Sequence, residues 1–153
     1  MTNLKEGDKA PDFKGEIQDG NEVSLADYKG KKLIIYFYPK DMTSGCTAES
    51  CDLRDNYSDL KKKGFEILGV SKDPITSHQK FIDKYDLPFD LLADTDVKMV
   101  TDYGVYGEKM NYGRTYMGIL RTTFVIDEEG VIERVFTNVN TSDHTTQIME
   151  SYQ

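Results

Sequence analysis

The sequence predicts an α/β fold in which helices flank a mixed central sheet, and three observations support this prediction. The run Leu33–Tyr38 is continuously apolar and rich in β-prone residues, which is typical of a buried strand. Strand-like and helix-like patterns alternate after it, as they do when helices pack on a sheet. A strand pair and a final helix then close the chain.

The first part of the chain predicts a hairpin, the buried strand and a helix. The pair Asp19-Gly20 separates residues 15–18 from residues 22–25, which indicates a small hairpin. Pro39 ends the buried strand, and residues 46–63 are expected to form one helix. Four residues share a face of that helix: Cys46, Leu53, Tyr57 and Leu60. Gly64 then stops the helix, after three lysines that suit its negative end.

The second part predicts strands over 65–71 and 89–93, helices over 75–85 and 97–103, and a final helix over about 142–152. Residues 104–118 are rich in glycine and tyrosine, and we expect a loop with extended parts there. Residues 122–126 and 131–135 are expected to pair as a hairpin. This order of elements matches a thioredoxin-like fold, and without repeats or linkers it predicts a single domain over residues 1–153.

Composition excludes several kinds of partner. The chain of 153 residues carries 19 basic and 27 acidic residues, a net charge of −8. Such a charge disfavours nucleic acids and anionic membranes, whose phosphates it would repel. The longest apolar run is far too short to cross a bilayer, and the first residues carry no apolar core of the signal-peptide kind. We therefore expect a cytoplasmic protein.

The chain has only two cysteines, and they are five positions apart. A secreted disulfide scaffold would have more, so two close cysteines suggest redox chemistry or half of a metal site. The spacing is not a common zinc half-motif, and His78 and His144 are expected on solvated helix faces. We therefore expect no metal or other cofactor.

Both cysteines lie where the buried strand gives way to a helix. A thiolate at Cys46, in the first turn, is stabilised by free backbone N–H groups and the positive end of the helix dipole. The hydroxyl of Thr43 is close enough in sequence to reach the sulfur or a bound oxygen, and Gly45 lets its backbone approach a ligand. Arg121, at the start of a predicted strand, would further favour the thiolate if it lay nearby.

Cys51 is less well placed to ionise. Five residues of helix separate the two cysteines by about 7.5 Å of rise and about 140° of rotation, whereas a disulfide needs Cα atoms roughly 4.4–6.8 Å apart. The residues suit oxidation of Cys46 to a sulfenic acid, condensation with Cys51 and reduction by an external dithiol. We therefore expect the first turns of the helix to unwind when Cys46 is oxidised.

Several ordered motifs resemble the peroxiredoxin family, and most closely its bacterioferritin-comigratory-protein or peroxiredoxin Q subgroup. The active-site part is Tyr36-Phe-Tyr-Pro-Lys-Asp41 followed by Thr43-x-x-Cys46-Thr-x-Glu-x-Cys51. Further similar segments are Gly7–Phe13, Tyr103–Lys109 and Tyr116–Asp127, so the resemblance spans nearly the whole chain.

The resemblance implies a thiol-dependent peroxidase for hydrogen peroxide and organic hydroperoxides. It implies Cys46 as the peroxidatic nucleophile, Thr43 and Arg121 as peroxide-binding and activating residues, and Pro39 as a shield for the thiolate. It further implies Cys51 as the resolving cysteine, thioredoxin as the reductant and a monomeric enzyme. Three residues depart from the commonest pattern of the subgroup without removing a catalytic group: Met42, Ser44 and Tyr106.

Other interpretations remain open at this point. A thioredoxin-like disulfide oxidoreductase would normally have a C-x-x-C motif, which this chain lacks. A peroxide-responsive sensor would form the same disulfide but would need only one turnover rather than repeated consumption of peroxide. Glu49 could hydrogen-bond near the site or simply favour the first helical turn, and of the two we expect the second.

Overall fold

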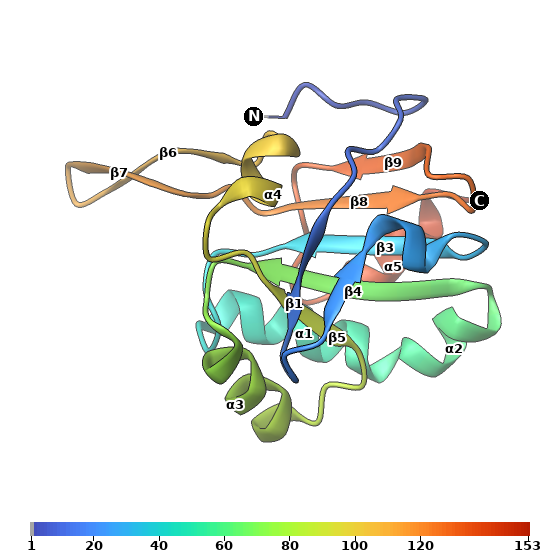
Figure 1. The fold of residues 1–153 in the computed structure, drawn as a ribbon, viewed down its shortest axis with the longest axis horizontal. Coiled ribbons are helices and arrows are strands. Elements are labelled where there is room, and N and C mark those ends of the chain that lie inside the picture. The colour runs from blue at the N-terminus through green and yellow to red at the C-terminus, as the bar shows by residue number, and fades with distance from the viewer. Residues whose placement is uncertain (1) are drawn as a thin grey trace.

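Figure 1 shows the computed structural model, which describes residues 2–153. Seven strands form the main sheet: β1 (Lys14–Ile17), β2 (Glu22–Ser24), β3 (Lys32–Phe37), β4 (Phe65–Ser71), β5 (Asp90–Ala93), β8 (Thr122–Ile126) and β9 (Ile132–Phe136). The α-helices are α1 (Ser44–Asp55), α2 (Tyr57–Lys62), α3 (Ile75–Tyr85), α4 (Lys98–Asp102) and α5 (His144–Glu150), and a short 3-10 helix covers Leu25–Tyr28. None of the helices within residues 2–153 has the length and apolar character needed to cross a membrane.

The sheet is mixed, as predicted, and its strand order is β2-β1-β5-β4-β3-β8-β9. β3 runs parallel to β4 and antiparallel to β8, so that Ile35 lies beside both Leu68 and Phe124. The predicted strand 65–71 and helix 75–85 have the observed bounds, and both predicted hairpins of the sheet form. The order of strands and helices confirms the predicted thioredoxin-like α/β fold.

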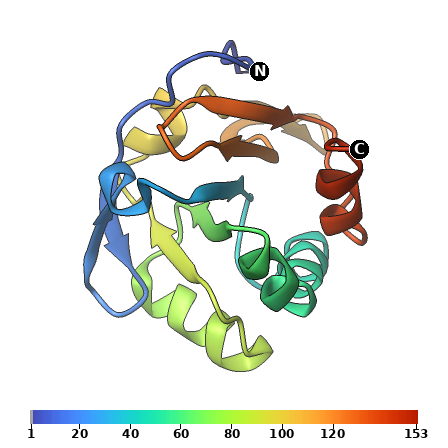
Figure 2. The same ribbon diagram turned by 90° about the vertical axis from the view of Figure 1, so that its right-hand side faces the viewer.

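Two apolar cores lie on opposite faces of the sheet, because successive side chains of a strand point in opposite directions. Ile34 and Tyr36 of β3 belong to the core that also contains residues of α1, α2, α3 and α5. Leu33 and Ile35 belong to the other core, which includes residues of α4 and of the N-terminal segment. Figure 2 shows the sheet between these two sets of elements. The end of β3 is therefore held from both sides.

The prediction of one helix over residues 46–63 is wrong in two respects. The helix begins earlier, at Ser44, and it is broken at Asn56 into α1 and α2. The side-chain amide of Asn56 donates to the Asp52 carbonyl, and its backbone N–H turns to the Leu53 carbonyl. These local bonds compete with the regular helical pattern, as asparagine side chains often do. Gly64 stops α2 with a positive φ of 90°, as predicted.

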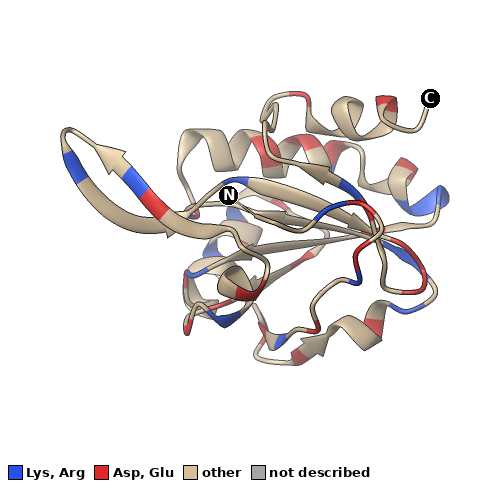
Figure 3. Cartoon of the chain, turned by 90° about the horizontal axis from the view of Figure 1, so that it is seen from above, with Lys and Arg blue, Asp and Glu red and all other residues tan. Residues whose placement is uncertain are grey.

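Residues 104–118 were predicted as a loop with extended parts; the extended parts are present, but they pair as a regular hairpin of β6 (Tyr106–Asn111) and β7 (Arg114–Ile119). Its turn places Tyr112 and Gly113 at positive φ, 53° and 76°, the requirement of a tight primed turn. The hairpin projects from the rest of the molecule as an arm (Figure 1) and carries charged residues (Figure 3). We call it the β6–β7 arm.

Both histidines differ from their prediction. His78 on α3 and His144 on α5 are fully buried rather than solvated. Each side chain is hydrogen-bonded to residues distant in sequence. A helix pattern locates a histidine on one face but does not show what that face meets.

Candidate active site

Cys46 lies in the first turn of α1 and is fully buried. Thr43 is the residue that precedes the helix, and the Thr47 N–H donates to its carbonyl at 2.9 Å, which is the first helical hydrogen bond. The N–H groups of Ser44, Gly45 and Cys46 come before that bond and have no acceptor within the helix. Cys46 therefore lies at the end of α1 where unpaired N–H groups give the helix dipole its positive pole.

Arg121 is brought to Cys46 by strand pairing. The register of β3 and β8 sets Phe37 opposite Thr122, so the residue before β8 lies beside the end of β3. The Arg121 Nη2 donates to Cys46 Sγ at 3.2 Å, across 75 positions of sequence. The contact sets a half-buried cation directly against the sulfur. Arg121 thus lies beside Cys46, as the sequence analysis considered.

Gly45 leaves room for the same contact. A Cβ built on Gly45 would lie only 3.2 Å from Arg121 Nη2. Any other side chain at this position would press on the guanidinium and move it relative to the sulfur.

Glu49 belongs to the site, and its prediction as a simple first-turn residue is wrong. It is fully buried one turn after Cys46, and its Oε1 accepts from Arg121 Nη1 at 2.7 Å. Burial raises the pKa of Glu49 to about 7, against the lowering effect of the Arg121 charge. Glu49 thus fixes the guanidinium through one nitrogen while the other faces the sulfur. The sequence did contain a signal for this role, since Glu49 follows Cys46 by three residues and so lies on the same face of the helix.

His144 lies behind Glu49. Its Nε2 is 3.6 Å from Glu49 Oε2 and 2.8 Å from Thr123 Oγ1, and its Nδ1 is 2.9 Å from Gln147 Oε1. Glu49 Oε2 is buried without a hydrogen-bond partner among residues 2–153. Burial lowers the pKa of His144, so the imidazole favours its neutral form. Sequence reasoning did not find this residue, because α5 lies far from Cys46 along the chain.

Pro39 and Thr43 both precede the Cys46 thiol in the sequence. The Thr43 side chain is exposed, and its hydroxyl donates to the Lys40 carbonyl at 2.9 Å. Pro39 is half-buried and directly follows the last two buried residues of the β3 region, Phe37 and Tyr38. In this arrangement the Thr43 hydroxyl is occupied by the backbone of its own loop rather than by the sulfur.

Cys51 is half-buried within the intact α1, and both cysteines are free thiols. Burial raises the pKa of the Cys51 thiol, so this group favours the neutral form. The next residue, Asp52, accepts from the backbone N–H and the hydroxyl of Thr145 at 2.7 and 2.8 Å. Two bonds to α5 therefore hold α1 just after Cys51.

A second cation, Lys109, comes from the β6–β7 arm. Its Nζ donates to the Ile119 carbonyl at 3.0 Å. Burial, and then repulsion by Arg121, lowers the pKa of Lys109, whereas the Cys46 charge acts in the opposite direction. The arm therefore borders the site, a role that a loop assignment did not reveal.

Comparisons with known proteins identify the family of this chain. The AhpC/TSA family profile matches residues 6–135. The chain is 49% identical to a putative peroxiredoxin bcp of Coxiella burnetii over 95% of this chain and 97% of the relative. It is 47% identical to peroxiredoxin Bcp of Escherichia coli K12 over 94% of this chain and 92% of the relative.

Solved structures give the same result. Peroxiredoxin Q of Xanthomonas campestris superposes with a TM-score of 0.85 at 34% identity, covering 91% of this chain and 88% of that one. A variant of peroxiredoxin Q from Xylella fastidiosa superposes with a TM-score of 0.92 at 26% identity, covering 99% and 97%. The chain therefore belongs to the AhpC/TSA family, and within it to the thiol-dependent peroxidases of the bacterioferritin-comigratory-protein or peroxiredoxin Q type.

Proposed function

We propose that Cys46 is the peroxidatic nucleophile of this peroxidase. Its thiolate attacks one oxygen of the peroxide, the O–O bond breaks, and the leaving oxygen takes a proton to become water or an alcohol. Cys46 is thereby oxidised to a sulfenic acid. The observation that carries this proposal is the 3.2 Å contact between Arg121 Nη2 and Cys46 Sγ in the first turn of α1.

The neighbouring residues receive roles around that contact. Arg121 stabilises the thiolate and the negative charge that develops on the peroxide, and Pro39 shields the sulfur from water. Thr43 binds the peroxide. To do so, its hydroxyl breaks its hydrogen bond to the Lys40 carbonyl and donates to an oxygen of the substrate instead. The exposed position of Thr43 leaves room for this rotation.

Cys51 is proposed as the resolving thiol. It condenses with the Cys46 sulfenic acid, so that a disulfide forms and water leaves. An external dithiol such as thioredoxin then reduces the disulfide by exchange and becomes oxidised itself. Because α1 is intact over both cysteines, this step requires its first turns to unwind.

Hydrogen peroxide and organic hydroperoxides are the proposed substrates. A solved relative, the Xanthomonas campestris bacterioferritin comigratory protein, is described by its alkyl peroxide reduction activity, which supports the organic class. We further propose a single domain that works as a monomer in the cytoplasm, where free thiols persist. Light scattering of the reduced protein tests the monomer.

Peroxide consumption with thioredoxin, thioredoxin reductase and NADPH tests the two-cysteine mechanism. Wild type is expected to turn over, Cys46→Ser to be inactive, and Cys51→Ser to lose thioredoxin-dependent turnover. Full turnover by Cys51→Ser would mean that an external thiol resolves the sulfenic acid. A single turnover that does not repeat would favour a sensor, and insulin reduction without peroxide would favour a disulfide oxidoreductase.

A further inference from the structure

The loop between β3 and α1 carries the proposed peroxide-binding Thr43 and leads directly into the Cys46 turn. One of its residues, Met42, has a φ of 69°. A residue with a side chain is strained in this left-handed region and stays there only where the surroundings hold it. The structure therefore needs an anchor for this loop.

Asp41 is that anchor. Its side chain is 1% exposed and accepts from three donors at 2.6, 2.8 and 2.7 Å: Tyr38 Oη, Ser77 Oγ and His78 Nδ1. Its backbone N–H donates to Asp73 Oδ2 at 2.9 Å, an oxygen that also accepts from Ser71 Oγ at 2.7 Å. The loop is thus fixed through both the side chain and the backbone of one residue.

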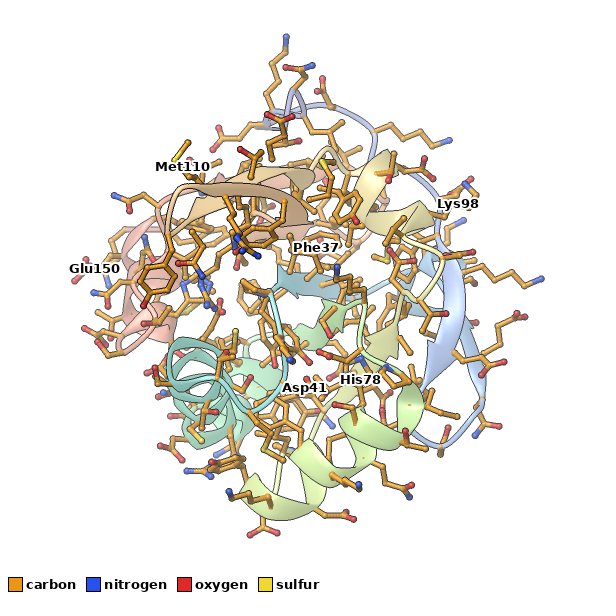
Figure 4. The ribbon with its side chains drawn as sticks, turned by 90° about the vertical axis from the view of Figure 1, so that its left-hand side faces the viewer. Phe37, Asp41, His78, Lys98, Met110 and Glu150 are labelled. Atoms are coloured by element: carbon orange, nitrogen blue, oxygen red, sulfur yellow. The ribbon has the colours of Figure 1, made fainter. Side chains whose placement is uncertain are left out.

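His78 connects this anchor to the sheet. It is fully buried on α3, and its second nitrogen, Nε2, lies 3.0 Å from the carbonyl of Leu92 on β5. Both ring nitrogens are therefore in use, Nδ1 toward Asp41 Oδ2 at 2.7 Å and Nε2 toward the Leu92 carbonyl. Figure 4 shows Asp41 and His78 side by side, reaching toward each other from the loop and from α3.

The composition of this cluster, Asp41, Asp73 and His78, is also that of a metal-ligand set. Its oxygens, however, already accept from hydroxyl, imidazole and backbone donors, each at hydrogen-bond distance. Burying such polar side chains costs desolvation, which offsets much of what their contacts add to stability, and the contacts that remain are directional. The cluster is therefore suited to hold the loop in one conformation.

We propose that His78 is a positioning residue for the peroxidase reaction, acting through Asp41 on the loop that presents Thr43 and the Cys46 turn. The inference rests on the proposed function of Cys46. Without the Nδ1 contact, Asp41 would lose one of the three partners that hold its buried side chain, and the loop would relax from its strained conformation. The step that suffers is the attack of Cys46 on peroxide, which depends on accurate placement of the reacting groups.

Two amide substitutions separate this role from mere packing. In His78→Asn the side-chain amide nitrogen is the same number of bonds from Cβ as Nδ1 is in histidine. The variant therefore retains a donor to Asp41. In His78→Gln the amide nitrogen corresponds to Nε2, so it retains the donor to Leu92 and loses the one to Asp41. Both variants lose the aromatic ring.

The measurement is a rapid-mixing single turnover of the full-length protein at increasing hydrogen peroxide concentrations, with thermal melts beside it. The phase that depends on peroxide concentration reports Cys46 oxidation, and the independent phase reports disulfide formation. We expect His78→Gln to slow the first phase roughly 10- to 100-fold and His78→Asn to stay within about threefold of wild type. The control is Ile132→Val, because Ile132 belongs to the core on the other face of the sheet from Cys46. This variant should lower the melting temperature and leave the first phase unchanged.

Equal first-phase rates for wild type and His78→Gln would overturn the proposal, as would equal losses in the two amide variants. Should His78→Gln fail to fold, Ser77→Ala removes another donor to Asp41 at a half-buried position. It should slow the same phase by about two- to fivefold, and an unchanged rate would count against the anchor. A wild type that shows no peroxide-dependent phase would instead refute the function of Cys46.

Discussion

Gly45 lies against the Arg121 guanidinium beside the Cys46 sulfur. Gly45→Ala would place a Cβ 3.2 Å from Arg121 Nη2, so the guanidinium must shift. The same change favours the helix by up to about 1 kcal/mol, because alanine is the better helix former. We expect kcat/KM for hydrogen peroxide to fall roughly tenfold while the melting temperature stays or rises.

Ala48→Gly, in the same helix, is the matched control for this change. It lowers helix propensity by the same amount without touching Arg121, and should lower stability more than activity. A Gly45→Ala variant with wild-type kcat/KM would show that the site tolerates the displaced guanidinium.

We expect the free energy of unfolding to depend on pH through the ionisation of Glu49. Its pKa in the folded protein is raised to about 7 by burial, from 4.5. Between these values the folded state holds a proton that the unfolded chain has released, so the free energy of unfolding falls as pH rises through this window. Glu49→Gln cannot release that proton and should lack this part of the slope in urea titrations from about pH 5 to about pH 8.

The control for the Glu49 prediction is Glu108→Gln, which changes an exposed carboxylate on the β6–β7 arm. It should keep the wild-type pH dependence. A Glu49→Gln variant with the same slope as wild type would mean that Glu49 ionises at an ordinary acidic pH.

At the scale of elements, α1 must combine order with the ability to open. Asp41 holds the chain before Cys46, and Asp52 is bonded to Thr145 of α5 just after Cys51. Both cysteines lie between these two fixed points. We expect amide exchange from Ala48 to Leu53 to be markedly faster in the disulfide form than in the dithiol form, with exchange in β4 unchanged. Identical exchange in the two forms would mean that the disulfide forms without unwinding.

The β6–β7 arm is a two-stranded hairpin that pairs with no other strand within residues 2–153. Its exposed apolar side chains include Met110 and Tyr112, which are 76% and 97% exposed. A lone hairpin is only marginally stable in water. We therefore expect its amides to exchange faster than those of β3 and β4 in the reduced protein, as mass spectrometry of deuterated peptides would show. Equal protection would indicate that another surface covers the arm in solution.

At the scale of the whole molecule, one sheet separates two cores. Ile34 and Ile35 are adjacent in β3, both fully buried, and belong to opposite cores. Each change to alanine should cost about 2–5 kcal/mol of unfolding free energy. Because both cores share β3, each variant should unfold in one transition, with the same urea midpoint by circular dichroism and by tyrosine fluorescence. Two separated transitions in either variant would show that the cores unfold independently.

Local patterns in the sequence determined a large part of this fold. The apolar run of β3, the amphipathic spacing of α3 and the turn signal at Asp19-Gly20 each depend on neighbouring residues alone. The position of Cys46 at a strand-to-helix junction is of the same kind, because a strand end and a helix start are both local features. The family resemblance then supplied Arg121 as a partner that no local pattern indicates.

Other features were decided only by the tertiary structure. The break at Asn56 depends on a side chain that bonds to the helix backbone, and the pairing of β6 with β7 depends on a turn at positive φ. Glu49 meets a partner 72 positions away, and His144 meets Thr123 at a distance of 21 positions. A periodic pattern shows which face of an element is buried. Which charged or polar group lies opposite that face depends on how distant segments pack, and that packing arranges the groups around Cys46.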